Sequence, residues 1–364
     1  MQKIGRYRLV RRLGAGSFAT VWLGRDDDLD VDVAVKILAE NWSTNADVRS
    51  RFLAEARLMR RIRDERIVRV YDIGTLPDDR PYFVMDYCDA GSLADLRRNP
   101  TDPVRTLRLC AEACRALDVL HRHQVVHRDV TPGNLLLDAN PDGSVRVLLA
   151  DLGVAKEMVG QQGMTMTAGT PSFMAPEQAT SGALGAWSDI YAMACVTQAV
   201  LTGRTPFAVK TVNDVMHRDG SEQPEPVAAS VGAPPELDAL LRSALALDPA
   251  HRPRSAQEMG AALDRIADAM GAWAADSNTS PAPAPRPPQP RTPSPQPQQQ
   301  PPAQGFAQPF AEFGQPSPVE HQPAMLSPTT VTPQTTPAWQ FWTLVSLIAV
   351  LVFIGTMFLT LIAL

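Results

Sequence analysis

Hydrophobic and polar positions follow three successive patterns along the 364-residue chain. Residues 1–272 mix charged and apolar side chains as a folded domain does, whereas residues 273–338 are mainly Pro, Gln, Ser, Thr and Ala. Residues 339–364 are almost continuously apolar. Because the composition changes at both boundaries, the sequence predicts a folded domain, a linker and a hydrophobic segment.

The start of the folded domain predicts a small sheet followed by a helix. Residues 7–13 alternate between apolar and polar side chains, which is typical of a strand. A glycine-rich turn follows, and residues 20–25 and 31–38 predict two more strands. Residues 48–63 then predict a helix.

The linker is the most proline-rich part of the chain. Eighteen of the 33 prolines lie between residues 281 and 337. Such a segment cannot bury enough apolar surface to offset its chain entropy, so we expect it to be disordered and partly polyproline II. We interpret it as a passive spacer, and a docking strip for partner proteins is the open alternative.

The apolar segment predicts a single membrane-spanning helix. Residues 341–364 contain neither charge nor proline, and as a helix they would extend roughly 36 Å across a hydrocarbon core of about 30 Å. Trp339 and Trp342 lie where interfacial anchors belong. The polar N-terminus lacks a signal peptide, so we expect a single-pass C-terminal anchor in the cell membrane, no folded domain beyond it, and a cytoplasmic N-terminal domain.

Charge and cysteine content exclude several classes of protein. The net charge of −5 argues against nucleic acid as a partner. The cysteines form no CxxC pair, so we expect reduced thiols rather than a disulfide framework or a zinc site.

Two features near the N-terminus indicate phosphate binding. Gly14 and Gly16 allow a tight backbone turn whose N–H groups can face phosphates, and a strand rather than a helix follows, unlike in a dinucleotide-binding fold. Lys36 ends an apolar strand and needs a counter-charge, which Glu55 on the predicted helix could supply.

Further motifs follow in a recognisable order along the chain. They are His127-Arg128-Asp129 with Asn134, Asp151-Leu152-Gly153, Ala175-Pro176-Glu177, Asp189 and Arg252. With the two N-terminal features, they make the first 270 residues resemble the eukaryotic-like (Hanks-type) serine/threonine protein kinases, in their bacterial, membrane-anchored branch. The resemblance implies an α+β bilobal kinase fold, with a β-rich N-lobe at about 1–88 and an α-helical C-lobe at about 89–272.

The resemblance also implies ATP as a ligand, proteins as substrates, and catalytic roles for individual residues. Asp129 would orient the substrate hydroxyl, and Asn134 and Asp151 would hold Mg²⁺, with Mn²⁺ as an alternative. The remaining catalytic residues implied are Lys36, Glu55, Arg128 and Thr170. Nucleotide-binding residues implied are Leu13, Gly14, Gly16, Val21, Ala34, Lys36, Met85, Asp86, Cys88 and Leu136.

Regulation is expected in the activation segment between Asp151 and Glu177. Thr165 and Thr167 are the predicted autophosphorylation sites, and Arg128 could pair with an added phosphate. Partners remain open beyond protein substrates and the lipid bilayer, and a kinase homodimer is one alternative.

Two positions depart from the family pattern. Ala19 replaces the third glycine of the turn, which is tolerable if its φ stays negative. Thr131 replaces the usual catalytic-loop lysine, so a weakly active or inactive pseudokinase adaptor at the membrane is the alternative to an active kinase. A small-molecule kinase of the aminoglycoside type is disfavoured because those enzymes lack the long activation segment.

Overall fold

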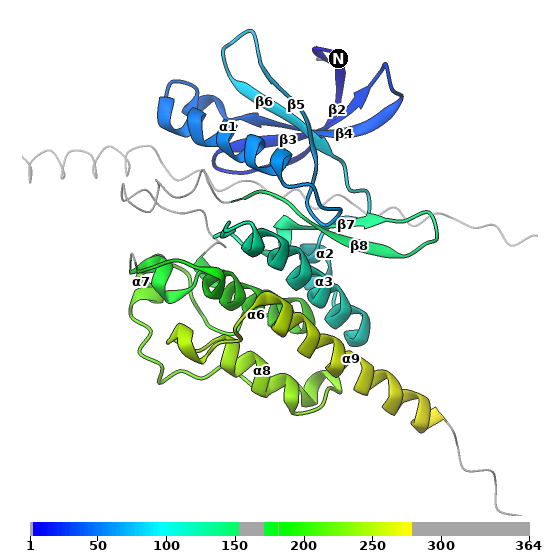
Figure 1. Ribbon diagram of the computed structural model, residues 1–364, viewed down its shortest axis with the longest axis vertical. Coiled ribbons are helices and arrows are strands. Elements are labelled where there is room, and N and C mark those ends of the chain that lie inside the picture. Colours follow the sequence, from blue (N-terminus) through cyan, green and yellow to red (C-terminus); the bar gives the residue numbers. More distant parts are fainter. Residues whose placement is uncertain (1–2, 153–170, 181, 279–364) are drawn as a thin grey trace, which may run out of the picture. The chain divides into compact units, whose positions relative to one another are not determined.

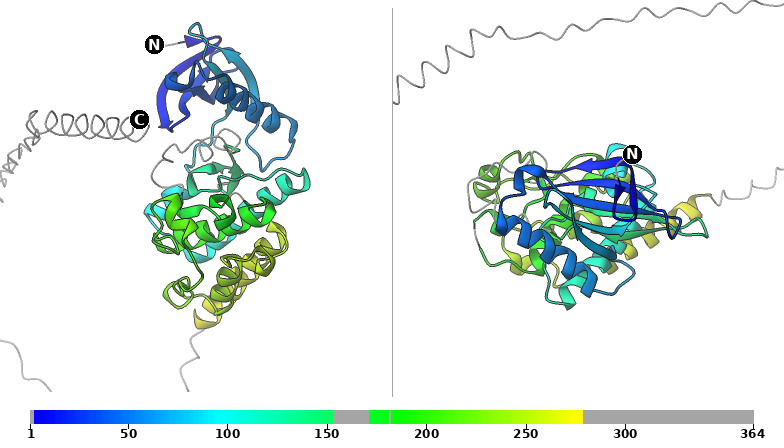
Figure 2. Two further views of the ribbon diagram at one scale, coloured as in Figure 1. Left: turned by 90° about the vertical axis from the view of Figure 1, so that its left-hand side faces the viewer. Right: turned by 90° about the horizontal axis from the view of Figure 1, so that it is seen from above.

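The computed structural model describes residues 3–152, 171–180 and 182–278. They belong to one compact unit, Met1–Pro287. Figure 1 shows this unit as a β-sheet with one long helix, and a second part made mostly of helices. The view in Figure 2 shows the same division into an N-lobe and a C-lobe, which confirms the predicted bilobal kinase fold.

The N-lobe is a six-stranded antiparallel sheet in the order β1-β2-β3-β4-β6-β5. Its strands are β1 (Lys3–Ile4), β2 (Tyr7–Ala15), β3 (Ala19–Asp26), β4 (Val31–Leu38), β5 (Val70–Thr75) and β6 (Pro81–Asp86). The three strands expected from the sequence are therefore present.

Helix α1 (Ala46–Arg61) packs against β5 and β6 and confirms the helix predicted at 48–63. Its buried side chains include Val48, Phe52 and Met59, which recur at helical spacing. The Asn45 side chain caps the helix by accepting hydrogen bonds from two backbone N–H groups of the first turn.

The C-lobe contains seven described helices and one small hairpin. The helices are α2 (Leu93–Arg98), α3 (Pro103–Arg122), α5 (Pro176–Ala179), α6 (Ala186–Thr202), α7 (Val212–Met216), α8 (Glu236–Ala244) and α9 (Ala256–Asn278). Strands β7 (Leu135–Ala139) and β8 (Val145–Leu149) form the hairpin, and α3 packs against α6, α9 and β8.

Helix α6 is the centre of the C-lobe. Every residue from Ser188 to Leu201 is buried, so the helix is covered on all its faces. Gly203 ends it in a left-handed conformation with φ of 77°, where glycine carries no Cβ penalty. Residues at the N-terminal end of α6 hold parts of the candidate site together.

The predicted linker and membrane segment fall largely outside the described residues. Helix α9 runs to Asn278, and residues 279–364 are not described. Within the described ranges, no helix combines the length and the apolar character that crossing a bilayer requires. All four cysteines are free thiols and buried.

Candidate active site

Lys36 bridges two carboxylates that come from different parts of the chain. Its Nζ lies 2.7 Å from Glu55 Oε1 on α1 and 2.8 Å from Asp151 Oδ1, which follows β8. The Lys36 Nζ also lies 5.4 Å from the centre of the Phe83 ring on β6. The structure therefore brings together an N-lobe strand, the N-lobe helix and the C-lobe segment that carries the predicted metal ligand.

Burial shapes the protonation of this charge cluster. Glu55 is almost fully buried, and this burial raises its pKa to about 7 against the opposing pull of Lys36. Burial alone would lower the pKa of Lys36, but Asp151 and Glu55 outweigh it and raise that pKa above its usual range. Two carboxylates share one ammonium, so Lys36 stays protonated while proton uptake by Glu55 is favoured.

The backbone at Asp151 and Arg128 adopts the left-handed region. Asp151 has φ of 56° and Arg128 has φ of 66°, which side-chain-bearing residues adopt only when neighbours hold them there. Both residues belong to the predicted catalytic machinery. Ala19, by contrast, begins β3 and is not among the described non-glycine residues with positive φ, so the methyl group at this position introduces no backbone strain.

Asp189 in the first turn of α6 binds the backbone of the predicted catalytic loop, residues 127–134. Its two carboxylate oxygens accept hydrogen bonds from the N–H groups of His127 at 2.8 Å and Arg128 at 2.9 Å. His121 on α3 places Nε2 2.8 Å from the same carboxylate. Asp189 is almost fully buried, so these three contacts satisfy a charge that would otherwise be costly to bury.

His127 connects the catalytic loop to the segment that carries Asp151. Its Nδ1 accepts a hydrogen bond from the Asp129 N–H at 3.2 Å, and Nε2 lies 3.0 Å from the Ala150 carbonyl oxygen. Because Nδ1 accepts and a carbonyl can only accept, the proton of the neutral ring belongs on Nε2. One buried imidazole thus sets the spacing between Asp129 and Asp151.

Asn134 contacts the predicted catalytic aspartate directly. Its Nδ2 donates to Asp129 Oδ2 at 2.8 Å and to the Asp129 carbonyl at 2.8 Å. With the amide nitrogen so used, the Asn134 Oδ1 is the atom that remains for a metal ion. Asn134 Oδ1 and the Asp151 carboxylate are hard oxygen donors, which fit the ligand preference of Mg²⁺.

Glu177 and Arg252 form a buried bidentate ion pair. Arg252 Nη1 lies 2.7 Å from Glu177 Oε1, and Nη2 lies 3.0 Å from Oε2. Arg252 also donates to the carbonyl of Trp187 at 2.9 Å, and Ser188 Oγ donates to Glu177 at 2.8 Å. Although burial works against it, the hydrogen bonds from Arg252 lower the pKa of Glu177.

Three residues predicted to bind adenine lie on neighbouring strands of the N-lobe sheet, and a fourth lies on the C-lobe hairpin. Ala34 on β4 pairs with Met85 on β6, Val21 on β3 pairs with Lys36, and Leu136 lies on β7. Cys88 follows β6 and is buried, which raises the pKa of its thiol to about 12. The Asp86 carboxylate accepts hydrogen bonds from the Arg69 N–H, just before β5, and from the hydroxyl of Tyr71 on β5.

The glycine-rich turn joins β2 to β3. Leu13 and Gly14 lie at the exposed end of β2, and the Gly16 N–H donates to the Ala19 carbonyl at 2.8 Å. A Cβ atom added at Gly14 would meet nothing within 4 Å. The protein's own atoms therefore leave space beside this turn, as a loop that covers phosphates requires.

Some functional candidates escaped the sequence prediction, and others cannot be placed. Gln178 was not predicted, yet its Nε2 donates to the Arg128 carbonyl at 2.8 Å. A glutamine three residues after Ala175, at the start of α5, was the available signal, because its Oε1 accepts from the Ala175 N–H at 3.0 Å. The predicted residues Thr165, Thr167 and Thr170 lie outside the described part of the chain.

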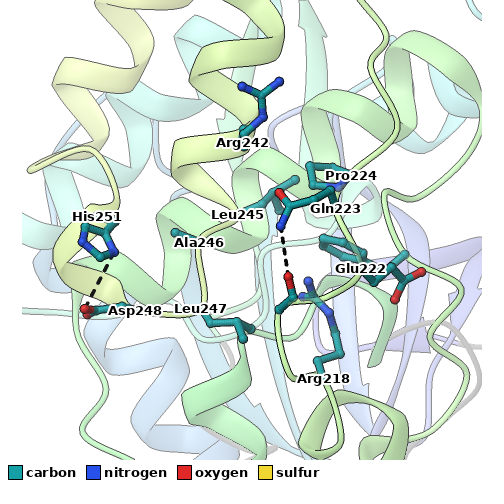
Figure 3. A pocket seen from close by; sticks show the side chains of 12 residues that line it. Arg218, Glu222, Gln223, Pro224, Arg242, Leu245, Ala246, Leu247, Asp248 and His251 are labelled. Atoms are coloured by element: carbon teal, nitrogen blue, oxygen red, sulfur yellow. Dashed lines mark hydrogen bonds and ion pairs between the residues drawn. The ribbon is translucent and has the colours of Figure 1, made fainter.

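A cavity of about 320 Å³ lies in the C-lobe, and Figure 3 shows its lining. Its walls include Phe207, Arg218, Arg242, Leu245 and His251, and none of the predicted site residues contributes to it. The Arg218 guanidinium lies 3.3 Å from the centre of the Phe207 ring. This cavity is therefore separate from the charge cluster around Lys36.

Comparison with known proteins agrees with the geometry of this site. The fold and the charge cluster define the class as a protein kinase domain, and residues 7–262 match the family described as "Protein kinase domain". The chain belongs to this protein kinase family.

The chain is similar to curated and solved bacterial kinases. It is 36% identical over 271 residues to serine/threonine-protein kinase PknB of Mycolicibacterium smegmatis, covering 72% of this chain and 43% of PknB. It is 35% identical over 259 residues to serine/threonine-protein kinase PknJ of Mycobacterium bovis, covering 69% of this chain and 44% of PknJ. The chain thus spans less than half the length of these curated relatives.

A crystal structure of the Mycobacterium tuberculosis PknI kinase domain has a similar fold. The TM-score is 0.55 at 26% sequence identity, and the alignment covers 73% of this chain and 98% of that domain.

Proposed function

We propose that this chain is a serine/threonine protein kinase that transfers the γ-phosphate of ATP to hydroxyl groups of proteins. One observation carries the proposal: Lys36 Nζ lies within 2.8 Å of both Glu55 and Asp151, while Asn134 lies 2.8 Å from Asp129. A cation, a candidate base and two oxygen ligands are thereby held close together by buried and partly buried contacts. Phosphoryl transfer depends on such positioning and on charge stabilisation.

Asp129 takes the proton in the proposed reaction. It orients the acceptor hydroxyl, whose oxygen bonds to the γ-phosphorus as the bond to the β,γ-bridging oxygen breaks and ADP leaves. The hydroxyl proton passes to the Asp129 carboxylate. Lys36, held by Glu55, places its positive charge on the α- and β-phosphate oxygens.

Asp151 and Asn134 would hold Mg²⁺, or Mn²⁺ in its place. When bound, the ion would supply positive charge that offsets the negative charge of the phosphate groups. The nucleotide base would occupy the space bounded by Val21, Ala34 and Leu136, against the strand that ends at Met85 and Asp86.

The direct test is phosphate transfer by the purified full-length chain supplied with radiolabelled ATP and Mg²⁺. Asp129→Asn and Lys36→Met should each reduce transfer at least about a hundredfold, since each removes a group placed at the reacting phosphate. Asp268→Asn is the control, because Asp268 on α9 forms an exposed ion pair with Arg108 on α3. A wild-type chain that binds ATP but transfers no phosphate would instead indicate a pseudokinase, with Thr131 as the first position to examine.

One regulatory feature inferred from the sequence belongs to the proposal. Autophosphorylation at Thr165 and Thr167 would supply anions for Arg128, and mass spectrometry after incubation with Mg²⁺ and ATP tests it. If the active kinase leaves both threonines unmodified, this part of the proposal is wrong.

Residues 339–364 are proposed to anchor the kinase domain, residues 1–272, at the cytoplasmic face of the cell membrane, with 273–338 as the tether. Fractionation of cells that express the chain with and without residues 339–364 tests the anchor. Recovery of both forms in the soluble fraction would contradict it.

A further inference from the structure

Trp42 contacts the tip of the glycine-rich turn from outside the sheet. It ends the short 3₁₀ helix Glu40–Trp42, and its indole Nε1 donates to the Ser17 carbonyl at 2.8 Å. Its ring stacks on Phe18, with ring centres 5.3 Å apart and planes at 26°. A single side chain thus holds both a backbone carbonyl and a side chain at the tip of the turn.

These contacts determine which way the peptide groups of the turn face. In a planar trans peptide, the C=O of one residue and the N–H of the next point in opposite directions. Holding the Ser17 carbonyl on the indole therefore directs the Phe18 N–H to the other side. The Phe18 carbonyl accepts a hydrogen bond from the Ala39 N–H at 2.8 Å. By the same argument, the Ala19 N–H points away from Ala39.

The Phe18 N–H is available to donate to a ligand. It donates to no backbone carbonyl among the residues that the structure describes. A backbone N–H without an acceptor is costly unless water or an anion accepts from it. Phosphate oxygens are strong acceptors for such groups.

Trp42 also connects the turn to the helix that carries Glu55. The Trp42 carbonyl accepts from the Asn45 N–H at 3.1 Å, and the Asn45 side chain caps α1. The same short segment therefore links the glycine-rich turn to the helix that pairs with Lys36.

We propose that Trp42 is a positioning residue that holds the glycine-rich turn with its backbone N–H groups directed at the phosphates of ATP. The inference rests on the proposed function for the identity of the ligand. It assigns to Trp42 an effect on phosphate binding rather than on binding of the base, because its indole hydrogen bond and its ring stacking both involve the tip of the turn, Ser17 and Phe18.

The test compares MgATP with adenosine, which lacks phosphates, by calorimetric titration of the full-length chain. Trp42→Phe keeps a ring against Phe18 but removes the donor, and the loss of one hydrogen bond should weaken MgATP binding about three- to tenfold. The affinity for adenosine should stay within about twofold of wild type, since the substitution leaves the apolar pocket for the base unchanged. Phe18→Leu, which keeps the donor and removes the stacking, should weaken MgATP binding in the same selective way.

Trp22→Phe is the matched control, because Trp22 lies on β3 and packs against the separate cluster of Ile4, Tyr7 and Leu9. Unchanged MgATP binding in Trp42→Phe would overturn the inference. So would an equal loss of MgATP and adenosine, which indicates general damage to the N-lobe. A wild-type chain that prefers MgATP over adenosine but transfers no phosphate would refute the proposed activity alone.

Discussion

Replacing Arg252 with methionine should strongly destabilise the C-lobe. The Arg252 side chain has no exposed surface, and its partner Glu177 is 10% exposed. The substitution leaves the Glu177 carboxylate without its cation. It also removes the donors for the carbonyl groups of Trp187, Ala246 and Leu247.

The magnitude follows from the burial of the pair. Breaking a buried ion pair by removing one partner costs about 3–5 kcal/mol, because the remaining charge stays buried. For a domain of this size, roughly 2–4 °C in melting temperature accompanies each kcal/mol, so the expected decrease is about 6–20 °C.

Urea unfolding of the full-length chain and of the variant, followed by circular dichroism, measures the change in unfolding free energy. Arg108→Met is the matched control, since Arg108 and Asp268 form an exposed pair that is worth about 0–1 kcal/mol. A loss of less than about 1 kcal/mol for Arg252→Met would refute the reasoning, because it would mean that the Glu177 charge is not held by Arg252.

The pH dependence gives an independent check on the same pair. The pKa of Glu177 is lowered in the folded state, so its contribution to stability is complete above the ordinary pKa of glutamate. The contribution is lost as the pH falls through the lower folded value. The difference in stability between wild type and Arg252→Met should therefore shrink under acidic conditions, and a constant difference would contradict the assignment.

Three further results are expected. Asp189→Asn removes one of the two oxygens that accept hydrogen bonds from the catalytic loop. Phosphate transfer should slow at least about tenfold with little change in ATP affinity, as measured by steady-state kinetics. An unchanged rate would show that the loop does not depend on Asp189. Burial raises the folded pKa of Glu55 from its ordinary value of 4.5 to about 7, so wild type should lose stability as the pH rises from about 4.5 to about 7. Urea unfolding of Glu55→Gln should lack this slope, and an identical slope would assign it to another group. Burial raises the pKa of the Cys88 thiol to about 12, so iodoacetamide at pH 8 should not modify it until urea unfolds the chain. Labelling of Cys88 in the folded chain, detected by mass spectrometry, would contradict this.

The N-lobe strands and the pairing of Lys36 with Glu55 could be predicted because they follow from local sequence patterns. Alternation at 7–13 and an apolar run at 31–38 are properties of neighbouring residues, and the strands formed there. An ammonium at the end of an apolar strand requires a buried anion, and Glu55 was the acidic residue on the facing side of the helix. Burial energetics therefore predicted a contact across 19 residues of sequence.

Other contacts of the site depend on tertiary structure that no local pattern carries. His121 meets Asp189 across 68 residues, and Trp42 meets Ser17 between a 3₁₀ helix and a turn. Both residues are ordinary in their own segments, one at the end of an amphipathic helix and the other beside a helix cap. Their partners are determined by how α6 and β2 pack, which periodicity does not encode.

The first turn of α6 carries a consequence for chimeric kinases. Asp189 holds the loop at 127–134, while Ser188 and the Trp187 carbonyl bind Glu177 and Arg252, so three successive residues connect that loop to the Glu177–Arg252 ion pair. None of these contacts involves residues 1–88. An N-lobe transplanted from another kinase would therefore meet a loop at 127–134 that the recipient's C-lobe already holds, and would have to supply the glycine-rich turn and a lysine–glutamate pair within reach of Asp151.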